Sequence, residues 1–317
     1  MPALRHTCLV TAAICFAATA PAAFDLRGRF EDVTAPLQVR ISGAETPFSA
    51  ITTSDTHGRF HFRALNPGTY IISAHVRGHG EATRTVVITP TLADAKHTVT
   101  IAIPLPPPVD PSDRARHRSM VSVAQLSVSD AARQKYDQAQ KDLAHTNVES
   151  ATIHLKQAVV LAPKFSAAWN SLGVISYQTR DFPSAESYFR KALESDPGAW
   201  TPTVNLGGVL LNLNKPSEAL AYNQSAVQMH PNDALANSQL GLNYFQIGQP
   251  DRAERYLRTA EQIDPSHFSH PQLTLAEIYA RRGDQAATLR ELNDFVQRFP
   301  DSPAAADIRK RLERFNK

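Results

Sequence analysis

Four histidines between residues 57 and 79 have a spacing that could bring imidazole rings together around a metal ion. His57, His61, His75 and His79 lie on either side of the turn residues Asn66-Pro67-Gly68. If this turn closes a hairpin, side-chain alternation puts all four rings on the outward face, with His61 and His75 as diagonal neighbours. Two neutral imidazoles without a carboxylate or a third histidine make a weak site. We therefore expect a half-exposed polar face here, with no bound metal and no cofactor.

The sequence carries none of the common catalytic motifs. It has no G-x-S-x-G nucleophile elbow, no H-E-x-x-H metal motif, no phosphate-binding G-x-x-x-x-G-K and no G-x-G-x-x-G after a strand. Carboxylates in the C-terminal two thirds recur as ordinary solvated positions. We therefore expect a protein that is not an enzyme and has no catalytic residues.

Residues 24–103 have the alternating pattern of short β-strands. Apolar side chains occupy every second position in several segments, and Asp55-Thr56-His57-Gly58 and Asn66-Pro67-Gly68 supply turn residues between them. About seven strands in so short a segment predict an antiparallel β-sandwich with one face of each sheet buried. Phe60, Phe62 and Tyr70 fall on the predicted inner face.

Two strings within this region resemble the carboxypeptidase regulatory-like domain. They run from Asp55 to Phe62 and from Leu65 to Tyr70, with Gly78 closing the segment. The resemblance implies a small prealbumin-like sandwich of the group with carbohydrate-binding-like folds. In that family the sandwich is an accessory module, so the resemblance predicts no activity of its own.

A 34-residue period organises the rest of the chain. Pro163, Pro197, Pro231 and Pro265 are 34 residues apart, and Pro300 follows after 35. Such a period is typical of helix-turn-helix repeats that stack into an all-α solenoid, because each helix pair cannot bury its apolar face alone. A proline placed after the second helix ends that helix.

Small and large residues recur at fixed places inside the period. The second unit has Trp169, Leu172, Gly173 and Tyr177, then Ala185, Phe189, Ala192 and Pro197. This pattern resembles the tetratricopeptide repeat (TPR), and five units agree in register over residues 129–300. Residues 301–317 are predicted to form a helix that caps the stack.

The TPR resemblance implies a concave groove lined by the first helix of each unit. Basic residues that clamp a peptide carboxylate in some family members are replaced here by Ala167, Ser171, Thr201 and Val204. We therefore expect an extended or helical segment with apolar side chains, its backbone bound by amides. Val174, Leu211 and Leu242 have core packing between repeats as an alternative role. The predicted partner-binding residues are Tyr136, Gln140, Asn170, Tyr177, Gln178, Thr201, Asn212, Ser238, Phe245 and Gln246.

The flanking segments predict export. Residues 1–22 combine one arginine, a short apolar run and the A-x-A sequence Ala20-Pro21-Ala22, which is typical of a secretory signal peptide; an uncleaved anchor is the alternative. Both cysteines lie in this segment. Residues 104–128 form a proline-rich linker. We therefore expect a periplasmic or secreted protein with no membrane span after signal cleavage.

Charge argues against a nucleic-acid-binding protein. The formal net charge is +3, and residues 119–317 carry 21 basic and 21 acidic side chains. Such a balance leaves no strongly basic solenoid face for a phosphate backbone. The sequence thus predicts an exported, non-catalytic adaptor that binds a protein or peptide of the cell envelope in its groove. The alternative is glycan binding by the sandwich, with the repeats as a scaffold.

Overall fold

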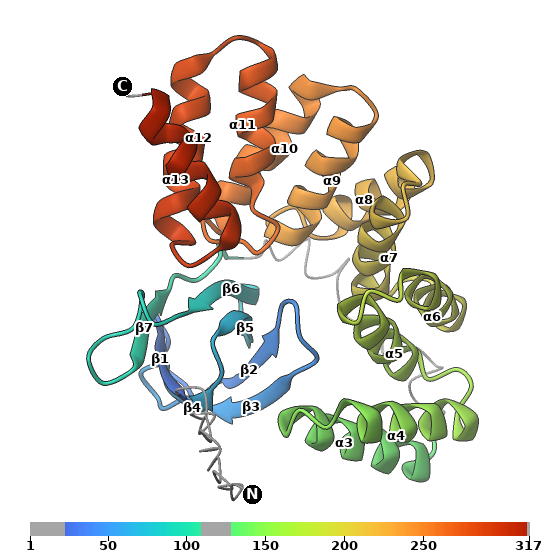
Figure 1. Cartoon of the computed structure of the whole chain (residues 1–317). Coiled ribbons are helices and arrows are strands. Elements are labelled where there is room, and N and C mark those ends of the chain that lie inside the picture. The colour runs from blue at the N-terminus through green and yellow to red at the C-terminus, as the bar shows by residue number, and fades with distance from the viewer. Residues whose placement is uncertain (1–22, 109–127, 316–317) are drawn as a thin grey trace, which may run out of the picture.

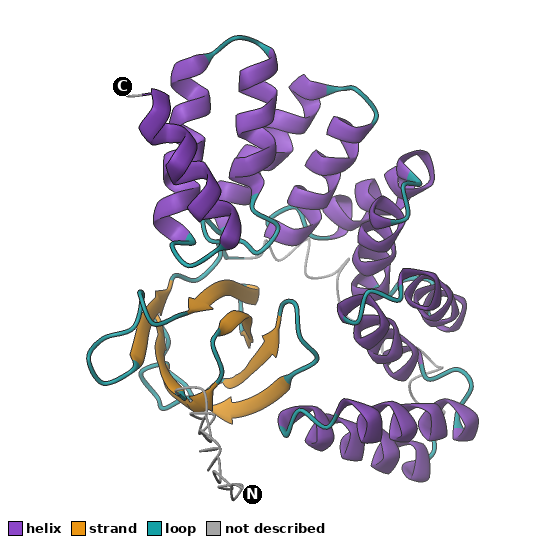
Figure 2. Ribbon diagram, in the orientation of Figure 1, coloured by secondary structure: helices purple, strands orange, loops and turns teal. Residues whose placement is uncertain are grey.

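The computed structural model describes residues 23–108 and 128–315. The predicted signal peptide and residues 109–127 of the predicted linker lie outside these ranges. Seven strands are followed by eleven helices within the described residues, as the sequence predicted for a β-sandwich and a helical solenoid (Figure 2). Within these same ranges, no helix has the length and apolar character needed to cross a bilayer.

The strands form two facing sheets. One has the order β4-β1-β7 and the other the order β3-β2-β5-β6. All pairings are antiparallel except that of β1 with β7, which is parallel. The strands are β1 (Phe24–Phe30), β2 (Gln38–Gly43), β3 (Ser49–Thr53), β4 (Arg59–Leu65), β5 (Gly68–Val76), β6 (Gly80–Ile88) and β7 (Thr98–Ile103).

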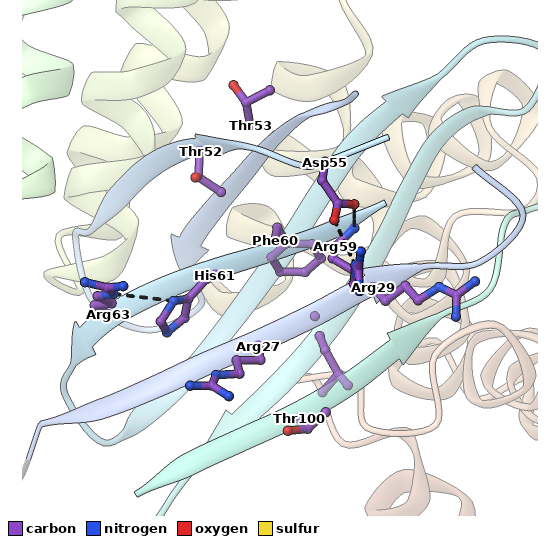
Figure 3. A pocket seen from close by; sticks show the side chains of 12 residues that line it. Arg27, Arg29, Thr52, Thr53, Asp55, Arg59, Phe60, His61, Arg63 and Thr100 are labelled. Atoms are coloured by element: carbon purple, nitrogen blue, oxygen red, sulfur yellow. Dashed lines mark hydrogen bonds and ion pairs between the residues drawn. The ribbon is translucent and has the colours of Figure 1, made fainter. Parts of the chain in front are cut away.

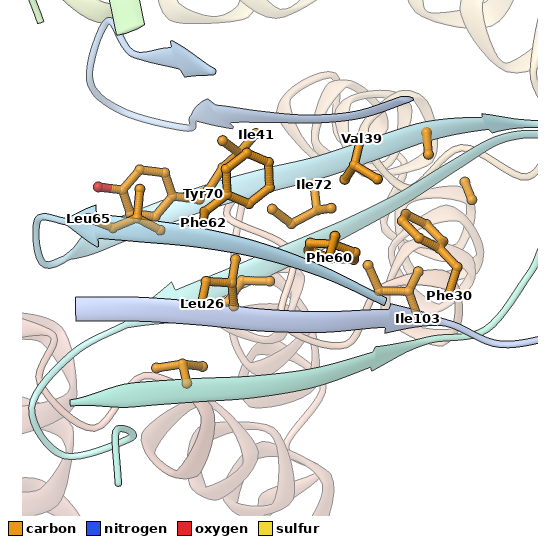
Figure 4. Close-up of a cluster of buried hydrophobic side chains, with 14 of the residues drawn as sticks. Leu26, Phe30, Val39, Ile41, Phe60, Phe62, Leu65, Tyr70, Ile72 and Ile103 are labelled. Atoms are coloured by element: carbon orange, nitrogen blue, oxygen red, sulfur yellow. The ribbon is translucent and has the colours of Figure 1, made fainter. Parts of the chain in front are cut away.

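The core of the sandwich lies between the inner faces of these sheets (Figure 4). Phe60, Phe62 and Tyr70 are buried there, as predicted. The ring of Phe60 lies across β1 at Gly28, where an added Cβ would come within 2.0 Å of a ring carbon. The absence of a side chain at Gly28 therefore lets this aromatic ring pack against the centre of β1.

The predicted hairpin at Asn66-Pro67-Gly68 is wrong. β4 pairs with β1, whereas β5 pairs with β2 and β6, so the turn passes from one sheet to the other. Ala64, which precedes the turn, has a φ of 55°, and this left-handed conformation lies at the register shift between the pairs Leu26–Phe62 and Phe24–Leu65, just before the chain crosses. The hydroxyl of Tyr70 donates to the carbonyl oxygen of Asn66 at 2.8 Å and holds the crossing.

The helices form pairs that follow the predicted period. Four second helices end two residues before Pro163, Pro197, Pro231 and Pro265, and a fifth ends two residues before Pro300. The helices are α3 (Asp130–Ala144), α4 (Val148–Leu161), α5 (Ser166–Gln178), α6 (Phe182–Ser195), α7 (Trp200–Asn212), α8 (Pro216–Met229), α9 (Ala234–Gln246), α10 (Pro250–Ile263), α11 (Pro271–Arg281), α12 (Gln285–Arg298) and α13 (Pro303–Phe315).

The small residues of the repeat allow close helix packing. A Cβ added at Gly173 of α5 would come within 2.5 Å of the ring of Phe189 on α6. Phe189 is fully buried, and Ala185 and Ala192 flank it on the same helix. The stacked pairs curve into an arc, and the sandwich lies inside that arc (Figure 1).

Candidate functional site: the inner wall of the solenoid and the docked sandwich

The histidines singled out in the sequence are dispersed. His61 is on β4 in one sheet and His75 is on β5 in the other, so they are not diagonal neighbours. His61 Nε2 lies 3.0 Å from Asp25 Oδ2, His75 Nδ1 lies 4.0 Å from Glu81 Oε2, and His79 Nδ1 lies 2.6 Å from the carbonyl oxygen of Pro106. Residues 23–108 and 128–315 contain no group of three or more His, Cys, Asp or Glu side chains that could hold a metal ion. The expected arrangement failed because it depended on the hairpin.

The predicted partner-binding residues lie on the first helices of the first four units, α3, α5, α7 and α9. Thr201, Asn212 and Gln246 are exposed, whereas Ser238 is buried. The others are partly exposed: Tyr136, Gln140, Asn170, Tyr177, Gln178 and Phe245. We call the surface carrying these ten residues the inner wall.

Several residues of the inner wall also hold neighbouring repeats together. Asn170 Oδ1 accepts a hydrogen bond from Asn205 Nδ2 at 3.0 Å, across from α5 to α7. Asn212 Nδ2 donates to the hydroxyl of Tyr177 at 3.1 Å, and burial raises the pKa of Tyr177 above its ordinary value. These bonds fix the orientation of the polar side chains along the wall.

Val174, Leu211 and Leu242 pack between the repeats, which was the alternative role for these apolar residues. Leu211 is buried in a cluster with Leu206 of the same helix and Phe189 of the neighbouring α6. Val174 and Leu242 are partly buried and pack against the same cluster. Their side chains stabilise the stack of helices.

The inner wall meets the sandwich at the end of α5. Gln178 Nε2 donates a hydrogen bond of 2.8 Å to the carbonyl oxygen of Gly43, the last residue of β2. Strand β3 also lies against α3. The sandwich is thus bound by a side chain that the sequence had predicted to bind a partner.

A second contact joins the sandwich to the other end of the arc. The amide N–H of Thr85 on β6 donates to Asp264 Oδ2 at 2.8 Å, and Arg84 Nη1 donates to the carbonyl oxygen of Ile263 at 3.2 Å. Further along, the hydroxyl of Thr91 donates to Asp301 Oδ1 at 2.7 Å. The sequence did not predict this contact. The group on the strand is a backbone N–H, which every residue except proline has, so no side chain on the strand marks it as a partner of a distant carboxylate.

Acidic groups gather where β6 meets the solenoid. Burial raises the pKa of Asp264, although the hydrogen bonds from Thr85 and the charge of Arg84 oppose the change. Burial also raises the pKa of Asp233 to about 6, against the hydrogen bonds at the start of α9, and the nearby Asp264 and Glu81 add to the increase. The interface therefore holds carboxyl groups that ionise less readily than usual.

The helical repeats match models of a known protein family. Tetratricopeptide repeat models match residues 129–199, 204–268 and 272–302, which is just over half of the chain. The chain belongs to the tetratricopeptide-repeat family.

Individual relatives match part of the chain. The human cell division cycle protein 16 homolog is 30% identical over 123 residues, which cover 36% of this chain and 20% of that protein. The chain therefore spans about a fifth of that relative. Among solved structures, YrrB, described as a TPR protein with an unusual peptide-binding site, is 23% identical, with coverage of 61% of this chain and 98% of that chain and a TM-score of 0.47. MamA from Desulfovibrio magneticus RS-1 is 21% identical, with coverage of 56% and 99% and a TM-score of 0.49.

Proposed function

We propose that the chain is an exported, non-catalytic scaffold that binds a protein or peptide partner along its inner wall. Solenoids of stacked helix pairs provide extended concave surfaces for such binding. Export rests on the sequence of residues 1–22, and it would place the partner in the cell envelope. The sandwich would be an accessory module of the carboxypeptidase regulatory-like kind.

The observation that carries the proposal is a row of amide side chains on the inner wall. Gln178, Asn212 and Gln246 are the last residues of α5, α7 and α9 and stand 34 residues apart, so they occupy the same place in three consecutive units. We call them the amide row. Gln178 already binds the backbone carbonyl of Gly43, which is the interaction expected with an extended peptide.

The other two members of the amide row have hydrogen-bonding capacity left. Asn212 donates its amide hydrogens to Tyr177 and to the carbonyl of Gly208, and among the described residues its Oδ1 has no donor. The side chain of Gln246 is exposed and makes no hydrogen bond with the described residues. An extended segment that crosses α7 and α9 could therefore donate a hydrogen bond to Asn212 Oδ1. It could also donate to, or accept from, the side-chain amide of Gln246.

The sandwich limits how a partner reaches the wall. It lies inside the arc and holds Gln178, so a partner bound at α7 and α9 would lie beside the sandwich (Figure 1). Phe60, Phe62 and Tyr70 are buried, so these aromatic rings offer no surface on which a neutral glycan could stack. This argues against binding of a neutral glycan by the sandwich.

The test is affinity capture from the native cell envelope with the chain from residue 23 onward. Thr201→Arg and Gln246→Arg place bulk and charge on exposed wall positions without touching the core, whereas Gln157→Arg does so on an exposed position of α4. We expect the same partner with the parent chain and with Gln157→Arg, and its loss with the combined wall variant. Equal capture by both variants would refute binding along the wall.

A further inference from the structure

The outward face of the three-stranded sheet carries a concentration of positive charge. Along β1, Leu26, Gly28 and Phe30 point into the core, so Arg27 and Arg29 point outward and are exposed. Along β4, Arg59, His61 and Arg63 occupy the outward positions in the same way, between the buried Phe60 and Phe62. Figure 3 shows these side chains over one face of the sheet, which we call the arginine face.

The strand register brings like charges together on the arginine face. Arg29 lies directly opposite Arg59, so that two positive charges face each other, whereas Arg27 lies opposite the ring of His61. Like charges in opposite positions of an antiparallel pair are unfavourable. Stability of the sheet therefore gives no reason for this arrangement.

The two carboxylates that are hydrogen-bonded to side chains of the arginine face are already engaged. Asp55 accepts hydrogen bonds from the backbone N–H of His57 and of Arg59, each at 2.9 Å, and from Arg59 Nε at 2.8 Å. Asp25 Oδ2 lies 3.0 Å from His61 Nε2. Arg63 Nε donates to His61 Nδ1 at 3.4 Å, so the neutral ring donates from Nε2 to Asp25.

Arg27 and Arg29 are left with unused donors. Neither guanidinium makes a hydrogen bond or an ion pair with any residue in the part of the chain that the structure describes, although the charge of Arg27 reaches Asp94 and contributes to lowering its pKa, after hydrogen bonds from Thr98 and Lys96. Each guanidinium presents a planar set of N–H groups that matches a carboxylate, sulfate or phosphate.

The arginine face is hollowed and bordered by hydroxyl groups. An open cavity of about 600 Å³ lies over it, within the range of about 300–1,000 Å³ that small-molecule sites occupy. Thr52 and Thr53 of β3 border it on one side and Thr100 of β7 on the other (Figure 3). These groups can bind sugar hydroxyls, whereas the arginines require negative charge.

The geometry points to a binding site for a small ligand, of the size of a sugar, that carries a carboxylate, sulfate or phosphate group. Arg27 and Arg29 bind the oxyanion, Arg59 and Arg63 add positive potential, and the threonines bind the remainder of the ligand. A free ligand fits better than a bilayer surface, because threonines of β3 and β7 border the open hollow beside the two unpaired arginines.

The test is calorimetric titration of the chain from residue 23 onward with glucuronate, glucose 6-phosphate, inorganic phosphate and glucose. We expect binding of glucuronate or glucose 6-phosphate and none of glucose. Arg27→Gln and Arg29→Gln should each weaken binding at least tenfold, whereas Arg40→Gln, an exposed position on β2 of the other sheet, should not. Circular dichroism would verify folding, which these exposed changes should leave intact.

The outcomes separate the sources of the oxyanion. Equally tight binding of inorganic phosphate would support an oxyanion site in which the sugar contributes little. No binding of any of the anions at millimolar concentration would overturn the proposal, as would an Arg40→Gln effect equal to that of Arg29→Gln. Association only with phosphatidylglycerol vesicles or with a single-stranded oligonucleotide would also overturn it, because a small-ligand site would then be absent.

Discussion

Asp233 offers a sharp test of how the solenoid and the sandwich are packed together. Its side chain caps α9 by accepting a hydrogen bond of 2.8 Å from the backbone N–H of Ala236. A carboxylate at a helix N-terminus normally ionises more readily, because the helix dipole and the N–H groups favour its charge. Here burial, together with the charges of Asp264 and of Glu81 on the sandwich, raises the pKa from 3.8 to about 6.

The magnitude follows from linkage between protonation and folding. Between pH 3.8 and about 6 the folded state binds more protons at Asp233 than the unfolded state, so stability falls as the pH rises through this window. Two pKa units correspond to about 3 kcal/mol at full burial. Because part of the residue reaches solvent, we expect about 1–2 kcal/mol. Asp233→Asn retains a capping oxygen and removes this penalty.

The assay is urea unfolding followed by circular dichroism from pH 4 to pH 8. We expect Asp233→Asn to match the parent chain near pH 4 and to be more stable by about 1–2 kcal/mol above pH 7. Asp284→Asn is the matched control, since Asp284 caps α12 through Ala287 at 2.9 Å but is exposed; its effect should stay below about 0.5 kcal/mol. A stability gain at Asp233 that is the same at every pH would refute the reasoning.

Two further changes test the packing of the arc. Arg258→Met removes the ion pair of 2.7 Å with Glu291, whose side chain is only 2% exposed, and leaves Glu291 with Arg290 at 3.3 Å; it should lower the free energy of unfolding by about 1–3 kcal/mol in urea, and a loss below 1 kcal/mol would contradict this. Asp264→Ala deprives the buried N–H of Thr85 of its acceptor. It should cost about 1–3 kcal/mol and speed hydrogen exchange at β6, and unchanged exchange there would show that this bond does not hold the sandwich.

The period of prolines predicted the helical part of the fold well. A proline at a fixed place ends a helix by local geometry, so the ends of α4, α6, α8 and α10 could be read from Pro163, Pro197, Pro231 and Pro265. The sequence also predicted the burial of Phe60 and Phe62, because alternation along a strand is local.

The failed prediction concerned long-range pairing. Asn66-Pro67-Gly68 has the residues of a hairpin turn, but whether the next strand pairs or crosses to another sheet depends on how both sheets pack. The parallel pairing of β1 with β7 is likewise invisible in either strand.

The two candidate sites differ in the same respect, because one depends on a local repeat and the other on long-range strand pairing. The amide row was predictable, because Gln178, Asn212 and Gln246 repeat with the helices. The arginine face was not, since Arg29 and Arg59 become neighbours only through the register of β1 with β4. The bond between Thr85 and Asp264 joins residues 179 positions apart.

The most direct test of the scaffold function is site-specific photo-crosslinking on the inner wall. A benzophenone side chain replaces Gln246 in one version of the chain and Gln157 in another, and each is irradiated in its native cell envelope. We predict a defined crosslinked partner from position 246, which is lost when Thr201→Arg is added, and none from position 157. The same crosslinks from both positions, or none from position 246, would contradict binding of a protein partner at the wall.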